Sequence, residues 1–348
     1  MFLILFLLLS LAVLAEADED RYPDIVVEGQ VQLQFEDGEL GALRAGARPA
    51  RNGLSGFPAR DVLRVRRLRL IPTVHLAPNW ALVNETDFEA DQLDFDETQL
   101  TMLDLYVRHR FDDQHHLRIG QFKVPFGWEF FRSSRALDTI ERSDVSRVLF
   151  QRDIGLGGFG QTERWEYGVA VVGGQGQNVA DRNGGKDLAA RLVYSLSPSL
   201  RVGASGHLGT IVPEGSDITQ PVQRYGLEAH FEEGPWKLEG ELILGDGYNL
   251  FSRADSRWRG YYLTGVYRAS EEVDAVVSFD QFDPDLDRVD LQRARDATNA
   301  RSRVVLGVNY YLSRKPVHRF QLNYEFRQAD EGAPAASRGL RARYQYAW

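Results

Sequence analysis

Hydrophobic and polar residues alternate along most of the chain after its first twenty residues. In VHRFQLNYEFR (317–327), every second residue from Phe320 to Phe326 is apolar, and the residues between them are polar or charged. VEGQVQLQF (27–35) and GPWKLEGEL (234–242) alternate in the same way. A period of two places the apolar residues on one face of an extended strand and the polar residues on the other. The pattern therefore predicts strands with one apolar and one polar face.

The predicted strands are about 10 to 14 residues long, which suits a tilted membrane crossing, whereas a soluble sandwich has shorter and more evenly spaced strands. Short turns such as APN, SPS and SRKP alternate with long polar connections such as 36–61, 174–186 and 284–301. Outer-membrane barrels have short periplasmic turns and long external loops. We predict an all-β fold, a 16-stranded antiparallel transmembrane β-barrel, with strands at 25–35, 62–76, 79–89, 98–111, 116–124, 150–160, 164–173, 187–197, 200–210, 222–233, 235–246, 257–268, 272–283, 302–313, 317–328 and 338–348.

The tryptophans are placed as an aromatic girdle would require. Trp80, Trp165 and Trp236 each follow a short turn, and Trp348 ends the chain. Indole rings gather at membrane interfaces, although the same residues also occur as ordinary core aromatics. A terminal aromatic residue on a membrane strand resembles the signal read by the barrel assembly machinery. Trp348 therefore predicts that machinery as a partner.

The N-terminus predicts export. An apolar run from Phe2 to Leu14, followed by small residues, predicts a signal peptide over 1–17 and a mature barrel domain over 18–348. An uncleaved anchor is the alternative, but the run is short for a bilayer crossing. The chain has no Cys, so no disulfide is expected, and its net charge of −9 argues against a nucleic-acid partner. The expected location is the bacterial outer membrane, with lipid around the barrel.

A barrel of sixteen strands encloses more space than side chains can fill, so a segment that narrows it is expected. The connection 125–149 is the candidate because it is rich in both aromatic and charged residues, and Pro125 would end the strand before it. We predict that 125–149 folds into the lumen as a constriction loop. The alternative is an external loop whose charges are solvated.

Of the 41 basic residues, 37 are Arg, whose planar guanidinium groups bind oxyanions through two parallel hydrogen bonds. Basic groups along a narrow passage raise the local concentration of anions. We therefore predict passive diffusion of small anions, with no catalytic residue, cofactor or metal. The candidate anion-binding residues are Lys123, Arg132, Arg135 and Arg142 at the constriction, and Arg67, Arg69, Arg108, Arg110 and Arg118 along the wall.

The segment RIGQFKVPFGWEFFRSSRALDTIERSDV (118–145) resembles the phosphate-selective porin O and P family. Its Gly-Gln-Phe-Lys, Pro-Phe, paired Ser and Glu-Arg-Ser elements carry the resemblance. RDIGL from Arg152 and GGQGQNVADRNGGKDLAARLVYS (173–195) are similar to the family's next strand and a later loop. The resemblance implies a homotrimeric outer-membrane porin that passes anions, with phosphate as a candidate substrate. Well-known members bind phosphate through a lysine cluster, whereas only Lys123 lies near the constriction here, so a general porin without phosphate selectivity is the alternative.

Two further patterns suggest other chemistry. Ser205 and His207 would share a strand face, which raises the alternative of an outer-membrane hydrolase with a Ser nucleophile and a His base. Asp181, Asn183 and Asp187 are spaced loosely like a calcium loop, but no Glu follows at the twelfth position, so a polar external loop is expected. A receptor barrel with a blocked lumen is a third class, and it would need a plug domain in addition to the barrel.

Overall fold

The computed structural model describes residues 22–37, 61–89, 99–147, 152–213, 216–249, 254–286, 300–329 and 337–348. The predicted signal peptide lies outside the described residues. Nearly all regular structure is β, with a short 3-10 helix η1 (Ser134–Ala136) and one turn of helix α3 (Asp144–Arg147). Within the described ranges, no helix is long and apolar enough to cross a bilayer. The strands are β1 (Asp24–Glu36), β2 (Val62–Ala77), β3 (Trp80–Glu89), β4 (Gln99–Arg110), β5 (His115–Lys123), β6 (Arg152–Gln161), β7 (Trp165–Val172), β8 (Asp187–Ser195), β9 (Leu200–Ile211), β10 (Gln220–Glu233), β11 (Trp236–Asn249), β12 (Ala254–Asp255), β13 (Trp258–Arg268), β14 (Val273–Asp283), β15 (Arg301–Ser313), β16 (Val317–Ala329) and β17 (Ser337–Ala347).

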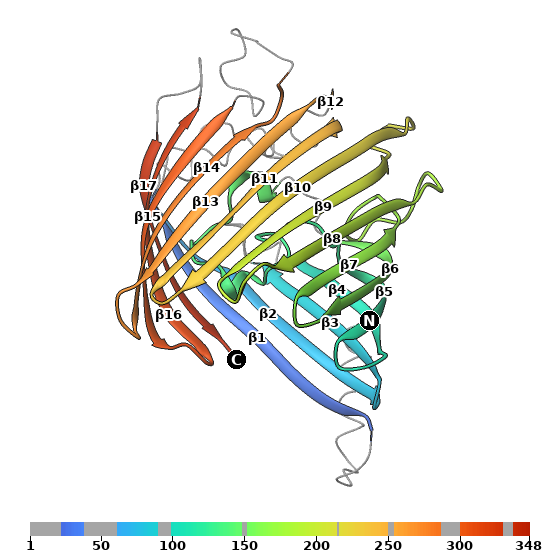
Figure 1. Cartoon of the computed structure of the whole chain (residues 1–348), viewed down its shortest axis with the longest axis horizontal. Helices are drawn as coiled ribbons and strands as arrows, with labels where there is room; N and C mark the ends of the chain where they lie inside the picture. The colour runs from blue at the N-terminus through green and yellow to red at the C-terminus, as the bar shows by residue number, and fades with distance from the viewer. Residues whose placement is uncertain are drawn as a thin grey trace.

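The strands form a closed antiparallel barrel. Each strand pairs with its neighbour in the chain, and β17 pairs with β1 to close the sheet, with Val31 opposite Tyr346. The two-residue β12 pairs only with the end of β11, so β11 continues the wall by pairing with β13. Figure 1 shows the tilted strands wrapping around one axis. The predicted 16-stranded antiparallel barrel is confirmed, and the predicted strand ends differ from those observed by at most three residues.

The two faces of the wall have the polarity that a membrane requires. Along β10, buried and exposed side chains alternate, and Leu227 is 60% exposed whereas its neighbour Glu228 is 5% exposed. The same inversion recurs on β13, where Leu263 is exposed and Tyr262 is buried. Exposed apolar residues suit contact with lipid, and the polar face turns inward. The side chains that face the lumen are therefore mainly the buried polar ones.

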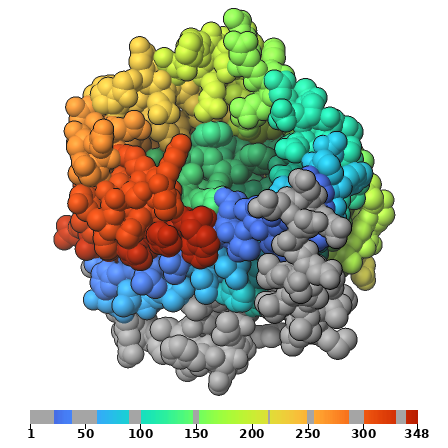
Figure 2. All heavy atoms as spheres, turned by 90° about the horizontal axis from the view of Figure 1, so that it is seen from below, coloured from blue at the N-terminus to red at the C-terminus, as the bar shows by residue number. Residues whose placement is uncertain are grey.

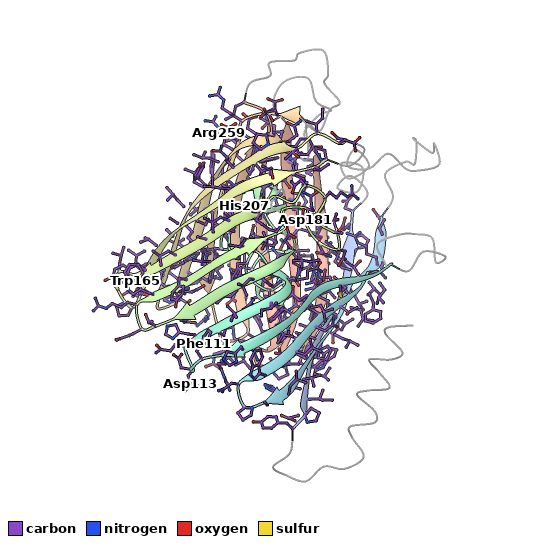
Figure 3. The ribbon with its side chains drawn as sticks, turned by 90° about the vertical axis from the view of Figure 1, so that its right-hand side faces the viewer. Phe111, Asp113, Trp165, Asp181, His207 and Arg259 are labelled. Carbon is purple, nitrogen blue, oxygen red and sulfur yellow. The ribbon has the colours of Figure 1, made fainter. Side chains whose placement is uncertain are left out.

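The aromatic girdle lies at the end of the barrel that carries the short turns. Trp80, Trp165 and Trp236 are all exposed, and each packs against a ring on the adjacent strand with centroids 4.2–4.6 Å apart. Figure 3 shows Trp165 at the same end as Phe111, with Arg259 at the opposite end. Exposed indoles beside the short turns fit a membrane interface better than a core.

Candidate functional site: the inner face of the barrel

The connection between β5 and β6, residues 124–147, is buried rather than solvated. Phe126, Phe130 and Val145 are at most 3% exposed and pack in one cluster with residues of β11, β13 and β14, including Trp258. Ile140 is also fully buried. Solvated external loops do not bury aromatic and aliphatic side chains in this way. The connection is therefore part of the packed structure of the barrel.

Carboxylates of β11 hold the backbone of this segment. Glu241 accepts hydrogen bonds from the backbone N–H groups of Trp128 (2.6 Å) and Glu129 (2.8 Å) and from the hydroxyl of Tyr262 (2.8 Å). Glu239 pairs with Arg132 at 2.5 Å. A carboxylate that accepts backbone N–H groups satisfies donors that would otherwise be buried without a partner. β11 thus fixes one side of the segment.

Strands β15, β16, β17 and β1 hold the rest of the connection 124–147. Arg319 of β16 donates to the carbonyl of Leu137 (2.8 Å), and Asn309 of β15 donates to the carbonyl of Asp138 (3.0 Å). Gln345 of β17 donates to the carbonyl of Arg135 (2.9 Å), and β1 contributes bonds from Gln30 and Gln34 to side chains of the segment. Seen from the end with the short turns, the strands enclose a hollow, and atoms in the green shades of the middle of the chain lie inside it (Figure 2).

β1 presents buried glutamines between two strands that carry arginines. Gln32 accepts a hydrogen bond from Arg67 of β2 (2.7 Å), and Gln34 accepts one from Arg343 of β17 (3.0 Å). An amide oxygen satisfies a guanidinium N–H without cancelling its charge. We call the five arginines that gather here the basic wall: Arg66, Arg67, Arg319, Arg341 and Arg343.

Acidic residues compensate the basic wall only in part. Glu141 of the connection pairs with Arg66 (3.1 Å) and lies 3.5 Å from Arg343, and Glu325 pairs with Arg341 (2.5 Å). Five buried guanidinium nitrogens nevertheless lack a hydrogen-bond acceptor among the described residues: Arg67 Nε, Arg319 Nε, Arg341 Nε, Arg341 Nη2 and Arg343 Nη1. Buried donors are nearly always bonded, so this cluster has the capacity to hold an oxygen-rich anion.

The four basic residues predicted at the constriction all have partners. Lys123 donates to main-chain carbonyls of the connection, the nearest being that of Arg132 at 2.9 Å, and Arg142 donates to the same carbonyl at 2.7 Å and to that of Glu129 at 2.9 Å. Arg132 pairs with Glu239, and Arg135 pairs with Glu28 of β1 at 3.2 Å. These cations therefore tie the segment together and to the wall.

Burial and neighbouring charges shift the pKa values of groups in this segment. Burial lowers the pKa of Arg142 to about 10, which leaves it protonated at neutral pH. Burial alone would raise the pKa of Asp138, but Lys237 and Arg132 outweigh it, so the pKa of this carboxyl lies below its ordinary value. Lys237 Nζ lies 2.6 Å from Asp138. The segment thus keeps its ion pairs across the neutral range.

The five predicted wall residues divide into four groups. Arg67 belongs to the basic wall, whereas Arg69 is neutralised by Asp87 (2.7 Å) and Glu85 (2.9 Å). Arg108 and Arg118 face each other across β4 and β5. Arg110 is exposed at the turn and donates to the carbonyl of Pro78. The predicted track is therefore not one continuous row.

Sequence reasoning missed most of the basic wall. Arg341 and Arg343 alternate with the apolar residues of the last strand, and Arg319 does so on β16, so a period-2 signal was present for each. Arg66 does not fit this alternation, because it is adjacent to Arg67 in the chain. A bulge opposite Gln32 and Leu33 inserts one extra residue in β2, so that Arg66 and Arg67 both turn inward.

His207 and Ser205 do not form the pair that a hydrolase needs. The ring nitrogens of His207 are bonded to Asp187 (2.9 Å) and Arg224 (2.9 Å), and the Ser205 hydroxyl accepts a hydrogen bond from the backbone N–H of Gly127 (3.3 Å). A Ser nucleophile is activated by a direct hydrogen bond to its base. His207 lies within the wall, as Figure 3 shows, and its contacts are those of an internal ion-pair network.

The residues that are spaced like a calcium loop also form hydrogen bonds with other groups. Asp181 accepts hydrogen bonds from the backbone of Asn183 and Gly184, whereas Asp187 bonds to His207. Across the described ranges, no three His, Cys, Asp or Glu residues converge as metal ligands.

Comparison with known proteins agrees with this architecture. The family model for phosphate-selective porin O and P matches residues 52–218. The predicted resemblance is confirmed, and the chain is an outer-membrane porin. No curated protein sequence matches the chain.

Solved porins share the fold of this porin at low sequence identity. The outer membrane channel DcaP of Acinetobacter baumannii is 12% identical with a TM-score of 0.67, over 96% of this chain and all of that one. The anion-selective porin from Comamonas acidovorans is 14% identical with a TM-score of 0.63, over 94% of this chain and all of that one. The trimer form of OmpT from Vibrio cholerae is 10% identical with a TM-score of 0.61, over the same shares.

Proposed function

We propose that this porin passes small anions by diffusion and that segment 124–147 forms the constriction of its channel. The observation that carries the proposal is the basic wall, where buried guanidinium groups meet neutral glutamines and carbonyls more often than carboxylates. In a passage of low dielectric constant, uncancelled positive charge attracts anions and repels cations. The similarity to an anion-selective porin of known structure supports the same reading.

Among anions, we propose oxyanions such as phosphate as the preferred substrates. Arginine binds a tetrahedral or planar oxyanion through two parallel hydrogen bonds, and the basic wall has buried N–H groups without an acceptor among the described residues. Chloride, which offers no pair of oxygens, would gain less from this arrangement. A general porin without phosphate selectivity is the alternative. We further propose a homotrimer in the outer membrane, as the trimer form of OmpT suggests, and recognition of Trp348 during assembly.

The test is the current through purified porin in a planar lipid bilayer. Across a chloride gradient we expect an anion-selective reversal potential, and added phosphate should block the chloride current. Arg67→Gln should weaken the phosphate block about ten-fold, because the loss of a charge-assisted hydrogen bond costs about 1.5 kcal/mol or more. Arg110→Gln is the matched control, since Arg110 is exposed at the turn.

The outcomes separate the two levels of the proposal. A cation-selective potential would overturn anion diffusion itself. An anion-selective potential without a phosphate effect would leave the general porin and remove the oxyanion preference. An equal effect of Arg67→Gln and Arg110→Gln would place the selective site away from the basic wall.

A further inference from the structure

A second group of cations lies on β4–β6, apart from the basic wall. Arg108 and Arg118 are cross-strand neighbours on the inner face, and like charges directly opposite each other in a sheet are unfavourable unless something compensates them. Arg118 donates to His116 Nε2 at 3.1 Å. Its guanidinium carbon also lies 5.1 Å from the centroid of Tyr106. In the part of the chain that the structure describes, no carboxylate lies within ion-pair distance of either guanidinium group.

Flat rings surround this pair. The guanidinium carbon of Arg118 lies 4.2 Å from the centroid of Phe159, and His116 stacks on the same ring with centroids 5.4 Å apart and planes inclined by 13°. Phe131 of the connection stacks on Phe159 at 6.4 Å and 22°. We call Arg108, His116, Arg118, Phe131 and Phe159 the Arg–ring cluster.

The cluster is built from the wall and from the connection together. Phe159 is 6% exposed and packs with Phe122, Val124 and Tyr106, which fixes the position of its ring. Arg108, Arg118 and Phe131 are only partly buried, so their polar and flat surfaces meet the lumen. Because β4 ends at Arg110 and β5 begins at His115, the cluster lies between the connection and the end with the short turns.

We propose that the Arg–ring cluster binds planar aromatic carboxylates, of which benzoate is the simplest. This inference rests on the proposed function, because the ligand must be an anion that enters the lumen. A carboxylate would accept N–H groups of Arg108 and Arg118, and a flat ring would stack with the guanidinium and aromatic planes. A simple oxyanion would contact the two guanidinium groups but would make no stacking contact with the aromatic rings. The pairing of two uncompensated cations with parallel rings therefore selects an anion that has both features.

The experiment compares three monovalent carboxylates as blockers of the chloride current through the porin in a planar bilayer. Benzoate carries a planar ring, cyclohexanecarboxylate has a similar size without one, and acetate has neither. Each is added to either side of the bilayer. We expect benzoate to reach half-block at about a five-fold lower concentration than cyclohexanecarboxylate, because stacking adds to the charge contacts. Acetate should be the weakest.

Two variants locate the site. Phe131→Leu should bring the half-blocking concentrations of benzoate and cyclohexanecarboxylate together. Arg108→Gln should raise both by about ten-fold, because it removes one of the two charges. Arg110→Gln should change neither. The two blockers are compared within each variant, so a change in the overall conductance of a variant does not enter the comparison.

Failure of this inference differs from failure of the proposed function. An anion-selective wild-type channel in which benzoate blocks no better than cyclohexanecarboxylate overturns the Arg–ring cluster as an aromatic site and leaves anion diffusion standing. Benzoate preference that survives both variants places the site elsewhere. A cation-selective wild-type channel overturns the proposed function, and this inference falls with it.

Discussion

Gly120→Ala is expected to abolish most of the folded barrel. Gly120 has a φ of 129°, a backbone conformation that residues with a side chain rarely adopt. A Cβ atom added to it would lie 2.4 Å from the carbonyl oxygen of Leu105 on β4. That oxygen belongs to the neighbouring strand, so relief of the contact requires β4 and β5 to separate. The backbone conformation alone costs about 1–3 kcal/mol for a residue other than glycine, before the contact is counted.

The measurement is the folded fraction after refolding in detergent, read from the mobility of unheated and heated samples in gel electrophoresis. Gly158→Ala is the matched control, because Gly158 lies on β6 next to β5 and a Cβ atom there would have no neighbour within 4 Å among the described residues. The control should fold like the wild type. Equal folding of the two variants would show that β4 and β5 tolerate a side chain at Gly120, contrary to this expectation.

The barrel could be predicted from the sequence because the membrane imposes one rule on every strand. Along most strands, exposed apolar residues that face lipid alternate with buried residues that face inward, many of them polar, as Leu227 and Glu228 do on β10. The two-residue β12 was missed because a pair of residues carries no periodicity. The predicted strand ends differ from the observed ones by up to three residues, because the residues of the turns do not alternate between apolar and polar.

The partners of the inner charges could not be predicted in the same way. Arg132 was expected to project toward a ligand, but it pairs with Glu239, a residue 107 positions later in the chain. That contact exists because the connection after β5 packs against β11, which local alternation does not encode. Arg66 shows the second limit, since a single bulge on β2 turns it inward against the expected register. Period 2 therefore determines which strand positions face inward, and long-range packing determines which charges remain uncompensated.

Glu241→Ala is expected to release segment 124–147 from β11 and raise the single-channel conductance. Glu241 accepts hydrogen bonds from two backbone N–H groups of the segment, those of Trp128 and Glu129, and from the hydroxyl of Tyr262. Each buried donor left without an acceptor costs about 1–3 kcal/mol, so the truncation removes several kcal/mol of attachment. Because a released segment samples positions nearer the wall or outside it, the passage should widen, the current should become noisier and the preference for anions should fall.

Single-channel recording in the same bilayer measures all three changes, and limited proteolysis reports on the segment independently. Glu232→Ala is the control, because Glu232 lies at the exposed end of β10 and its side chain is 64% exposed beside Arg268. Its conductance should match the wild type. If Glu241→Ala folds but keeps the wild-type conductance and selectivity, segment 124–147 does not limit the current. The constriction would then have to be sought in another part of the lumen, whereas the barrel and the basic wall would stand, because neither depends on Glu241.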